Sequence, residues 1–318
     1  MNIFPLPYSI PREKIRNLGN LNNKKRIISL HSAGEVVKDW STFKPNYSYD
    51  TEASYYDQYE ESKYAVTKKK GGWDCLRHYE ILANNCLPLF ENLEKCPKKT
   101  MFNFPKEILI YVKDNWKNIT DTEYNSIVKY IHKYTKSNLT CESSARYLLK
   151  SINTNNYKQP KILMINNNLM KKKNWPNYSQ FLITIGLRNV LHEKFVEYPK
   201  NEILYKNYKG PSGYGRGFTY SKTLNDLNID RNNIEKKIKN KDFDFIIYGL
   251  MGKQETDFGD IRLNCPFWEI VKEKYDSNRI AFIYGSDKMH SKDNIKLLEH
   301  LMFHSKHGYC FVRELDID

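Results

Sequence analysis

The chain has 318 residues, 40% of them hydrophobic, which is enough to bury sizeable cores, and its length favours about two domains over one. No apolar run approaches the roughly 18 to 20 residues that a membrane span needs, so we expect no span. Lysine and arginine number 51 against 37 aspartates and glutamates, which leaves a net charge of +14 and favours polyanions or phosphorylated small molecules as partners. A/T-rich coding would also enrich lysine, asparagine, isoleucine and tyrosine, and this weakens the inference of a nucleic-acid partner.

The first residues and the cysteines indicate the compartment. The opening Met1–Pro5 lacks the charged and apolar regions of a signal peptide. The six cysteines are scattered, with no Cys-x-x-Cys pair and no cysteine–histidine ladder at zinc spacing. We therefore expect reduced thiols, no metal centre, and a cytoplasmic protein, or one made in the cytoplasm of an infected host cell if the source is viral.

The first half of the chain has an irregular pattern. Its proline-rich piece at 5–11 is typical of a linker, or of a strap over another surface. Short apolar runs at 26–30 and 108–112 predict strands, and 122–149 predicts one or two closing helices. The Asn-Thr-Asn-Asn run within 152–160 predicts a boundary between two domains, 1–155 and 156–318.

The segment 64–90 is the most informative part of the sequence and predicts a strand, a basic glycine loop, a helix and a second strand. Gly71 and Gly72 permit backbone approaches that a side chain would forbid, and Asp74 is a candidate N-cap for the helix. A helix N-terminus behind a glycine loop presents unpaired N–H groups and the positive end of a dipole. We therefore predict that a diphosphate binds at this loop.

The predicted helix extends to about Asn84, and Asn84 or Asn85 would provide a left-handed exit from it. Arg77 and Glu80 are three residues apart and share a face, so Arg77 would reach phosphate and Glu80 would accept hydrogen bonds from ribose hydroxyls. His78 would either face the bound ligand or lie in the interior as a hydrogen-bonded histidine. The alternative interpretation is an ordinary βαβ unit with a solvated Arg/Glu pair. The residues predicted to bind this nucleoside diphosphate, as the donor-binding site, are Lys70, Gly71, Gly72, Trp73, Asp74, Arg77, His78 and Glu80. Lys68 and Lys69 would add positive charge.

The second half is easier to interpret, because short β-like apolar runs alternate with helical patterns. The predicted strands are 161–165, 244–249, 279–285 and 309–313, and the predicted helices are 227–239, 267–275 and 294–304. This alternation of strands and helices is typical of parallel strands joined by right-handed crossovers, and so of a doubly wound α/β sheet.

The run from Arg77 to Phe90 has the spacing Arg-x-x-Glu-x-x-x-x-x-Cys-x-Pro. It resembles the donor-site signature of exostosin-like and related GT-B glycosyltransferases. The resemblance implies two Rossmann-like α/β domains that face each other across a cleft. It also implies a metal-independent transferase of the hexosyl type, which takes a UDP- or GDP-sugar as co-substrate and a glycan or other hydroxyl acceptor. In that family the glutamate is expected to bind the donor ribose and the arginine to lie near phosphate, which corresponds to Glu80 and Arg77.

Two departures from the family pattern stand out. Retaining enzymes often carry a second glutamate eight residues earlier, where this chain has Gly72, so the stereochemical outcome stays open. The donor motif normally lies in the C-terminal domain, whereas here it lies in the first half. We infer that the two halves are swapped in sequence order, an arrangement that Rossmann halves with neighbouring termini tolerate.

Candidate catalytic bases follow the strand predicted at 279–285. Asp287 and His290 would lie at the carboxyl edge of the parallel sheet, where ligands bind in open α/β folds. We assign them, with Asp257 and His192 behind them, as groups that deprotonate the acceptor. The alternative is that these residues are a capping aspartate and a surface histidine.

The glycine-rich run Gly213, Tyr214, Gly215 and Arg216 does not match a dinucleotide fingerprint, because the glycines alternate without the Gly-x-Gly-x-x-Gly spacing. We interpret it either as a cleft loop near the donor phosphate or acceptor, or as a structural turn.

Two other functions remain open from the sequence. One is glycosylation of modified bases in DNA, because phage DNA glucosyltransferases share the GT-B architecture and the charge is suitable. The other is a non-catalytic nucleotide- or nucleic-acid-binding protein built on two Rossmann units.

Overall fold

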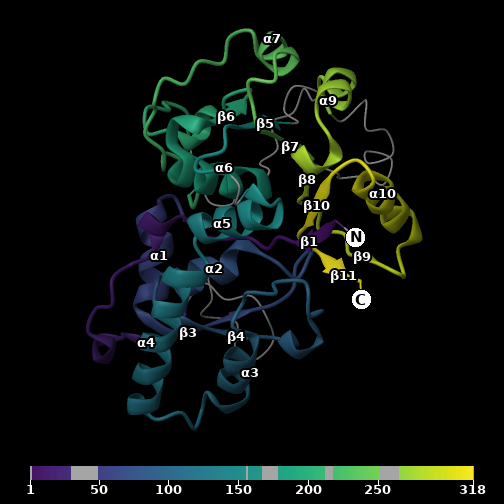
Figure 1. The fold of residues 1–318 in the computed structure, drawn as a ribbon. Coiled ribbons are helices and arrows are strands. Elements are labelled where there is room, and N and C mark those ends of the chain that lie inside the picture. Colours follow the sequence, from purple (N-terminus) through teal and green to yellow (C-terminus); the bar gives the residue numbers. More distant parts are fainter. Residues whose placement is uncertain are drawn as a thin grey trace.

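The computed structural model describes residues 2–29, 49–154, 157–166, 178–211, 218–250 and 265–317. The described chain is an α/β protein with a six-stranded parallel sheet, a three-stranded parallel sheet and a short two-stranded pairing (Figure 1). In order across it, the six-stranded sheet contains β1 (Ile3–Pro5), β10 (Tyr309–Val312), β8 (Ile280–Tyr284), β7 (Phe245–Leu250), β5 (Ile162–Asn166) and β6 (Phe195–Tyr198). The doubly wound sheet predicted for the second half is therefore confirmed in its strands and in their parallel pairing.

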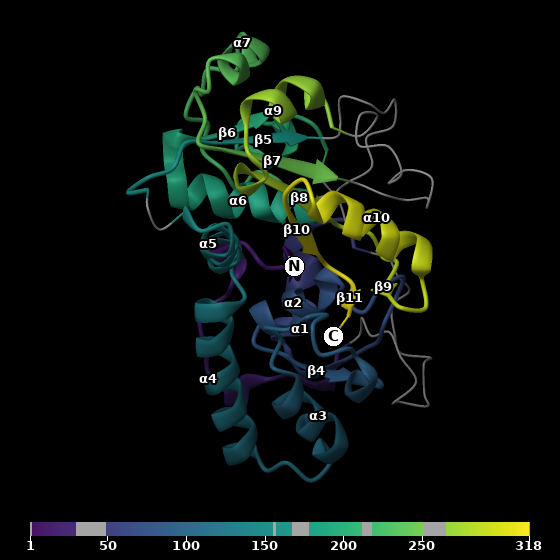
Figure 2. The same cartoon turned by 45° about the vertical axis from the view of Figure 1, so that its right-hand side comes forward.

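Helices cover both faces of this sheet (Figure 2). On one face Leu148 and Leu187 pack with Ile162, whereas Ile238 and Leu301 pack with Leu163 on the other. The alternation of successive strand residues between two cores is the period of a strand buried on both sides. The first face carries α5 (Cys141–Ser151) and α6 (Tyr178–Leu191), and the second carries α7 (Ile234–Lys239), α9 (Trp268–Lys274) and α10 (Ile295–Ser305).

The three-stranded sheet lies in the first half and has the order β2-β3-β4. The segment predicted as strand, loop, helix and strand has that structure, with α2 joining two adjacent parallel strands. Asn85 has φ 54°, which is the left-handed exit expected after the helix. The elements of this part are β2 (Arg26–Ile28), α1 (Glu52–Glu60), β3 (Ser62–Thr67), α2 (Leu76–Ala83), β4 (Leu87–Phe90), α3 (Lys106–Asn115) and α4 (Asp121–Asn138).

The strand predicted at 108–112 is wrong, because these residues lie inside α3. Leu109 and Val112 are buried, and Tyr111 between them is exposed, so the buried positions follow the helical rather than the strand period. Apolar runs of this length do not distinguish the two structures by themselves.

The helix predicted at 227–239 is shorter than expected and begins only at Ile234. Asn228 and Asn233 both have left-handed backbone angles, with φ 53° and 52°. A right-handed helix cannot continue through such residues. Short 3-10 helices occur at Arg12–Lys14, Leu21–Asn23, Leu93–Lys95, His192–Lys194, Glu202–Leu204 and Ser277–Arg279.

The N-terminal segment links the two sheets. Residues 3–5 form β1 and pair in parallel with β10, so only Pro5 of the proline-rich piece at 5–11 lies in a strand. The chain then runs buried through Tyr8 to Ile10, whose amide donates to the Leu139 carbonyl over 2.9 Å. The two ends of the chain lie near each other beside both sheets (Figures 1 and 2).

One hydrophobic core combines side chains from both halves of the sequence. Tyr79 and Leu82 of α2 belong to the same cluster as Phe181 of α6 and Tyr220. The division into 1–155 and 156–318 stays a prediction. In the described residues, no helix is both long and apolar enough to cross a bilayer.

Candidate functional site

Three loops that follow the carboxyl ends of parallel strands meet between the two sheets. The loop after β3 contains Gly71 and Gly72, the loop after β8 contains Asp287, and β10 is followed directly by Arg313 and Glu314. The backbone amides of Trp73 and Asp74 donate to the Glu314 carboxylate over 3.1 and 2.8 Å. The predicted donor loop is thus in direct contact with the residues that follow β10.

The two loop glycines allow this contact. A Cβ atom at Gly71 would lie 2.5 Å from Oδ2 of Asp287, and one at Gly72 would overlap the Glu314 carboxylate. A side chain at either position would force the neighbouring carboxylate to move. The double glycine therefore serves close packing against the edge of the six-stranded sheet in this structure.

Arg313 connects two of these loops from a buried position. Its side chain is 1% exposed, and its terminal nitrogens donate to the Asp74 carbonyl oxygen and to the Asp287 carboxylate. The guanidinium also lies over the Tyr8 ring, 4.6 Å from its centre. The Asp287 side chain is 65% exposed, so it is the solvent-facing member of the group.

Asp74 is not the N-cap that the sequence predicts. The cap position is Cys75, which makes no side-chain cap bond. The Asp74 carboxylate is buried instead, and it accepts from the Tyr8 amide over 2.6 Å and from the Tyr79 hydroxyl over 2.9 Å. Burial raises the pKa of Asp74 to about 7, with Arg313 acting in the opposite direction. The Asp74 carboxylate points inward because the Tyr8 amide of the N-terminal segment donates to it there.

Glu80 and Arg77 are both buried, at 7% and 9% exposed, so the interpretation of a solvated pair is wrong. Each carboxylate oxygen of Glu80 accepts a hydroxyl hydrogen bond, Oε2 from Tyr55 over 2.7 Å and Oε1 from Thr219. Burial raises the pKa of Glu80, and the two hydroxyl bonds and the charge of Arg77 oppose this. Glu80 thus bridges helix α1 and the second half of the chain.

The surroundings of Glu80 are rich in aromatic rings, and the tyrosines of α1 among them were not predicted from the sequence to belong to the site. Tyr55 and Tyr59 of α1 are four residues apart, and their ring centres lie 5.3 Å from each other. Phe218 lies 6.2 Å from Tyr55, and the Tyr56 hydroxyl is 3.1 Å from the Thr219 hydroxyl. The i, i+4 spacing within the tyrosine-rich stretch was the available signal, since such residues share a helix face.

His78 lies in the interior, as the second of its two interpretations expects. Its ring nitrogens lie 3.1 Å from the Thr67 hydroxyl and 3.1 Å from the Trp73 carbonyl oxygen. Its ring centre is 4.2 Å from that of Phe90, and burial lowers its pKa to about 3. Both ring nitrogens have partners within the chain, and the assignment of His78 to the donor stays a prediction.

The predicted bases separate in the structure. Asp287 is exposed and lies against Gly71, at the carboxyl edge where it was expected. His290 is 1% exposed in β9 (His290–Ser291), which pairs with β11 (Leu315–Asp316), and burial lowers its pKa to about 4. His192 is exposed but precedes β6, so it lies at the amino edge of the sheet. The structure therefore does not bring His290 or His192 beside Asp287, and their assignment as acceptor bases stays a prediction.

The remaining predicted site residues cannot be placed. Asp257 and the run Gly213, Tyr214, Gly215 and Arg216 lie outside the described residues. Within the described ranges, no group of three or more histidine, cysteine, aspartate or glutamate side chains is arranged to hold a metal ion.

Arg313, Glu314 and Tyr8 were missed by the sequence analysis. Arg313 and Glu314 directly follow β10, so the rule that ligands bind at the carboxyl edge was the signal that could have found them. Tyr8 carried no such signal, because its position depends on a pairing between the two ends of the chain.

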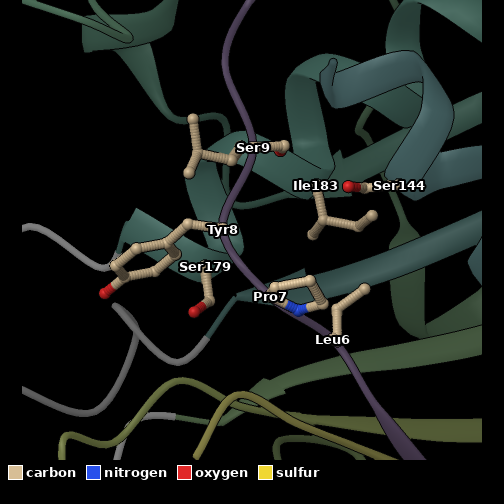
Figure 3. Close-up of a pocket in the computed structure, with 8 residues that line it drawn as sticks. Leu6, Pro7, Tyr8, Ser9, Ser144, Ser179 and Ile183 are labelled. Carbon is tan, nitrogen blue, oxygen red and sulfur yellow. The ribbon is translucent and has the colours of Figure 1, made fainter. Parts of the chain in front are cut away.

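A small cavity lies apart from Glu80, along the N-terminal segment between Leu6 and Ser9 (Figure 3). Ser144 and Ser179 contribute hydroxyls to its wall. Its volume is about 10 Å³, which is room for about one water molecule and not for a sugar or a nucleotide.

The chain was compared with models of protein families, with characterised proteins and with solved structures. None of the three comparisons gives a match.

Proposed function

We propose that the protein is a metal-independent glycosyltransferase of the GT-B type, with exostosin-like donor recognition. The donor would be a UDP- or GDP-sugar bound by the segment from Lys68 to Glu80, and the acceptor a glycan or another hydroxyl compound bound mainly by the second half of the chain. Two Rossmann-like domains would face each other across a cleft, with the halves in swapped sequence order. The neighbouring chain ends support this order, because a circular rearrangement needs them close together.

The observation that carries the proposal is the hydrogen bonding of Glu80. Its buried carboxylate accepts one hydroxyl on each oxygen, from Tyr55 and Thr219. A ribose offers the same pair of donors through its 2′ and 3′ hydroxyls, so it could replace the two side chains without leaving the carboxylate unsatisfied. Rings of Tyr55 and Phe218 beside it would supply a stacking surface for the base or the sugar.

Positive charge next to Glu80 supports a diphosphate in the same place. Lys70 lies in the loop, and its pKa is lowered by the loss of hydration there and by the charge of Arg77. Arg77 also lowers the pKa of Glu80, so its charge acts on both Lys70 of the loop and Glu80. Lys70, Arg77 and the amides of the loop would stabilise the charge that develops on the departing diphosphate.

The reaction would transfer the sugar from phosphate oxygen to acceptor oxygen. The acceptor oxygen would form a bond to the anomeric carbon while the bond from that carbon to the diphosphate breaks, and the diphosphate would leave with the electron pair. In a single displacement the acceptor proton would go to Asp287, because this carboxylate is exposed and lies beside Gly71. Without a metal, the charge on the leaving group would be balanced by Lys70 and Arg77.

The proposal is tested by nucleotide binding and by turnover. A thermal-shift series with UDP, GDP and their sugars should raise the melting temperature for the true donor, because a ligand that binds only the folded state stabilises it. Release of nucleoside diphosphate from that donor should be detectable even with water as acceptor. Glu80→Gln should abolish the shift, whereas Glu107→Gln on α3 serves as the matched control for loss of one carboxylate. No shift with any nucleotide, or a shift that survives Glu80→Gln unchanged, would contradict the proposal.

A further inference from the structure

We propose that Glu314 is an internal anion that closes the turn at Trp73 and Asp74, and that a phosphorylated ligand must displace it in order to bind. The inference rests on the proposed function, because it concerns the same turn. It adds a self-inhibitory contact. The present structure, with Glu314 bound to the turn, is the closed state.

The first step is the hydrogen bonding of the turn. Oε2 of Glu314 accepts from the Trp73 amide and Oε1 accepts from the Asp74 amide, so each oxygen takes one N–H group. These are the donors that a phosphate at this turn would use. An amide has a single proton to donate, so the carboxylate and a phosphate exclude each other there.

Steric contact also excludes a phosphate from the turn while Glu314 occupies it. The Glu314 carboxylate lies so close to Gly72 that even a methyl group on this glycine would overlap it. Glu314 is 1% exposed, so its carboxylate fills the space in front of the turn. A phosphate group, which is larger than a methyl group, cannot share that space.

Charge opposes joint occupancy as well. Asp74, Asp287 and Glu314 surround one guanidinium, that of Arg313. Adding a diphosphate to three carboxylates and one cation would raise the electrostatic energy in a poorly hydrated place. Exchange of one anion for another keeps the charge closer to its present value.

The segment that carries Glu314 is bonded to its neighbours outside the six-stranded sheet. Glu314 lies between β10 and the two-residue strand β11, on a strap whose next residue, Leu315, bonds Thr100. The Leu315 amide donates to the Thr100 hydroxyl over 2.9 Å, and this hydroxyl donates to the Leu315 carbonyl oxygen over 3.0 Å. The Glu314 carbonyl oxygen also accepts from the His290 amide over 2.9 Å, and β11 pairs with β9, so the carboxylate would leave the turn by rotation of the Glu314 side chain while the backbone keeps these bonds.

Binding of inorganic pyrophosphate, of UDP and of GDP to variants tests the inference. Isothermal titration should give an apparent Kd about tenfold lower for Glu314→Gln than for the unaltered protein, because the glutamine side chain has no charge and one acceptor oxygen in place of two, so the closed state competes less. Asp287→Asn is the matched control, since it removes a negative charge beside Arg313 without freeing an amide of the turn. Its Kd should change by less than about threefold.

Each outcome is decisive. Equal affinity of the unaltered protein and Glu314→Gln would overturn the role of Glu314 and leave the proposed function standing. An equal gain in both variants would also overturn it, because charge alone would then explain the effect. If pyrophosphate, UDP and GDP bind to none of the three proteins, the proposed function fails together with the inference.

Hydrogen exchange provides a measurement on the unaltered protein. Saturating pyrophosphate should slow exchange in 71–76, which would gain a ligand, and speed exchange in 313–317, which would lose its contact. Slower exchange in both segments would mean that ligand and Glu314 are held together, and this would overturn the inference.

Discussion

The guanidinium of Arg313 stacks on the ring of Tyr8 while it donates to the Asp74 carbonyl oxygen. The two partners are distant from it in sequence, and Tyr8 belongs to the segment that crosses between the sheets. A single buried cation therefore connects the N-terminal crossing, the loop before α2 and, through Asp287, the edge of β8.

Replacement of Arg313 should destabilise the whole protein. Arg313→Ala is expected to lower the free energy of unfolding by about 3 kcal/mol or more, because it leaves buried acceptors and the Asp74 and Glu314 carboxylates without their cation. Arg313→Lys should recover only part of the loss, since one ammonium cannot reach both partners of the planar group. Urea denaturation measures both values. Arg12→Ala removes an exposed arginine as the control, and a loss at position 313 no larger than at position 12 would contradict the prediction.

Asp74 should make stability depend on pH. Its folded pKa of about 7 lies above the usual value for an unfolded aspartate, about 3.9, so the folded state binds the proton more tightly. The stability that this provides is fully present below about pH 4 and is lost as the pH rises to about 7. Burial is the main cause, with Glu314 in the same direction and Arg313, the Tyr8 amide and the Tyr79 hydroxyl opposing it.

The measurement compares urea midpoints of the unaltered protein and of Asp74→Asn between pH 5 and pH 8. Asparagine imitates the protonated acid, so the loss of stability with rising pH should be smaller in the variant by roughly 1 to 3 kcal/mol. Identical pH profiles would show that Asp74 does not titrate in this range.

The two loop glycines should respond differently to a methyl group. Gly72→Ala would overlap the buried carboxylate of Glu314 and should cost roughly 1 to 3 kcal/mol. Gly71→Ala meets only the exposed Asp287 side chain, which can move, so its cost should be below about 1 kcal/mol. A double-mutant cycle of Gly72→Ala with Glu314→Ala should give a coupling energy above about 0.5 kcal/mol. Additive effects would contradict the close contact.

The hydroxyl donors to Glu80 should contribute to stability as well. Tyr55→Phe or Thr219→Val removes one donor from a buried carboxylate and is expected to cost about 1 to 3 kcal/mol. In a Glu80→Gln background the same changes should cost less, because the charge is gone. Chemical denaturation of the four proteins of each cycle measures the coupling, and zero coupling would mean that the hydroxyls do not hold the carboxylate.

The local elements of the chain could be predicted because their patterns are local. The segment 64–90 contains its own strand, glycine loop, helix and left-handed exit at Asn85, and these follow from neighbouring residues. The same is true of β5, β7, β8 and β10, whose apolar runs are short and regularly spaced. The error at 108–112 has a physical basis, because the buried positions of α3 depend on what packs against it.

The roles of individual polar side chains depended on long-range contacts. Asp74 was expected at the start of a helix, but the Tyr8 amide and the Tyr79 hydroxyl draw it inward. His290 was expected at an open edge, but β9 and β11 bury it. No pattern near either residue indicates these partners.

The amino-acid sequence by itself thus determined an α/β chain with parallel strands and a glycine loop that precedes a helix, because spacing along the chain sets burial and backbone freedom. Tertiary structure decided what fills that loop. The contact of Glu314 with the amides of Trp73 and Asp74 joins groups about 240 residues apart. Such a contact depends on how the sheets pack and on the electrostatic balance around Arg313, and both arise only when the two ends of the chain come together.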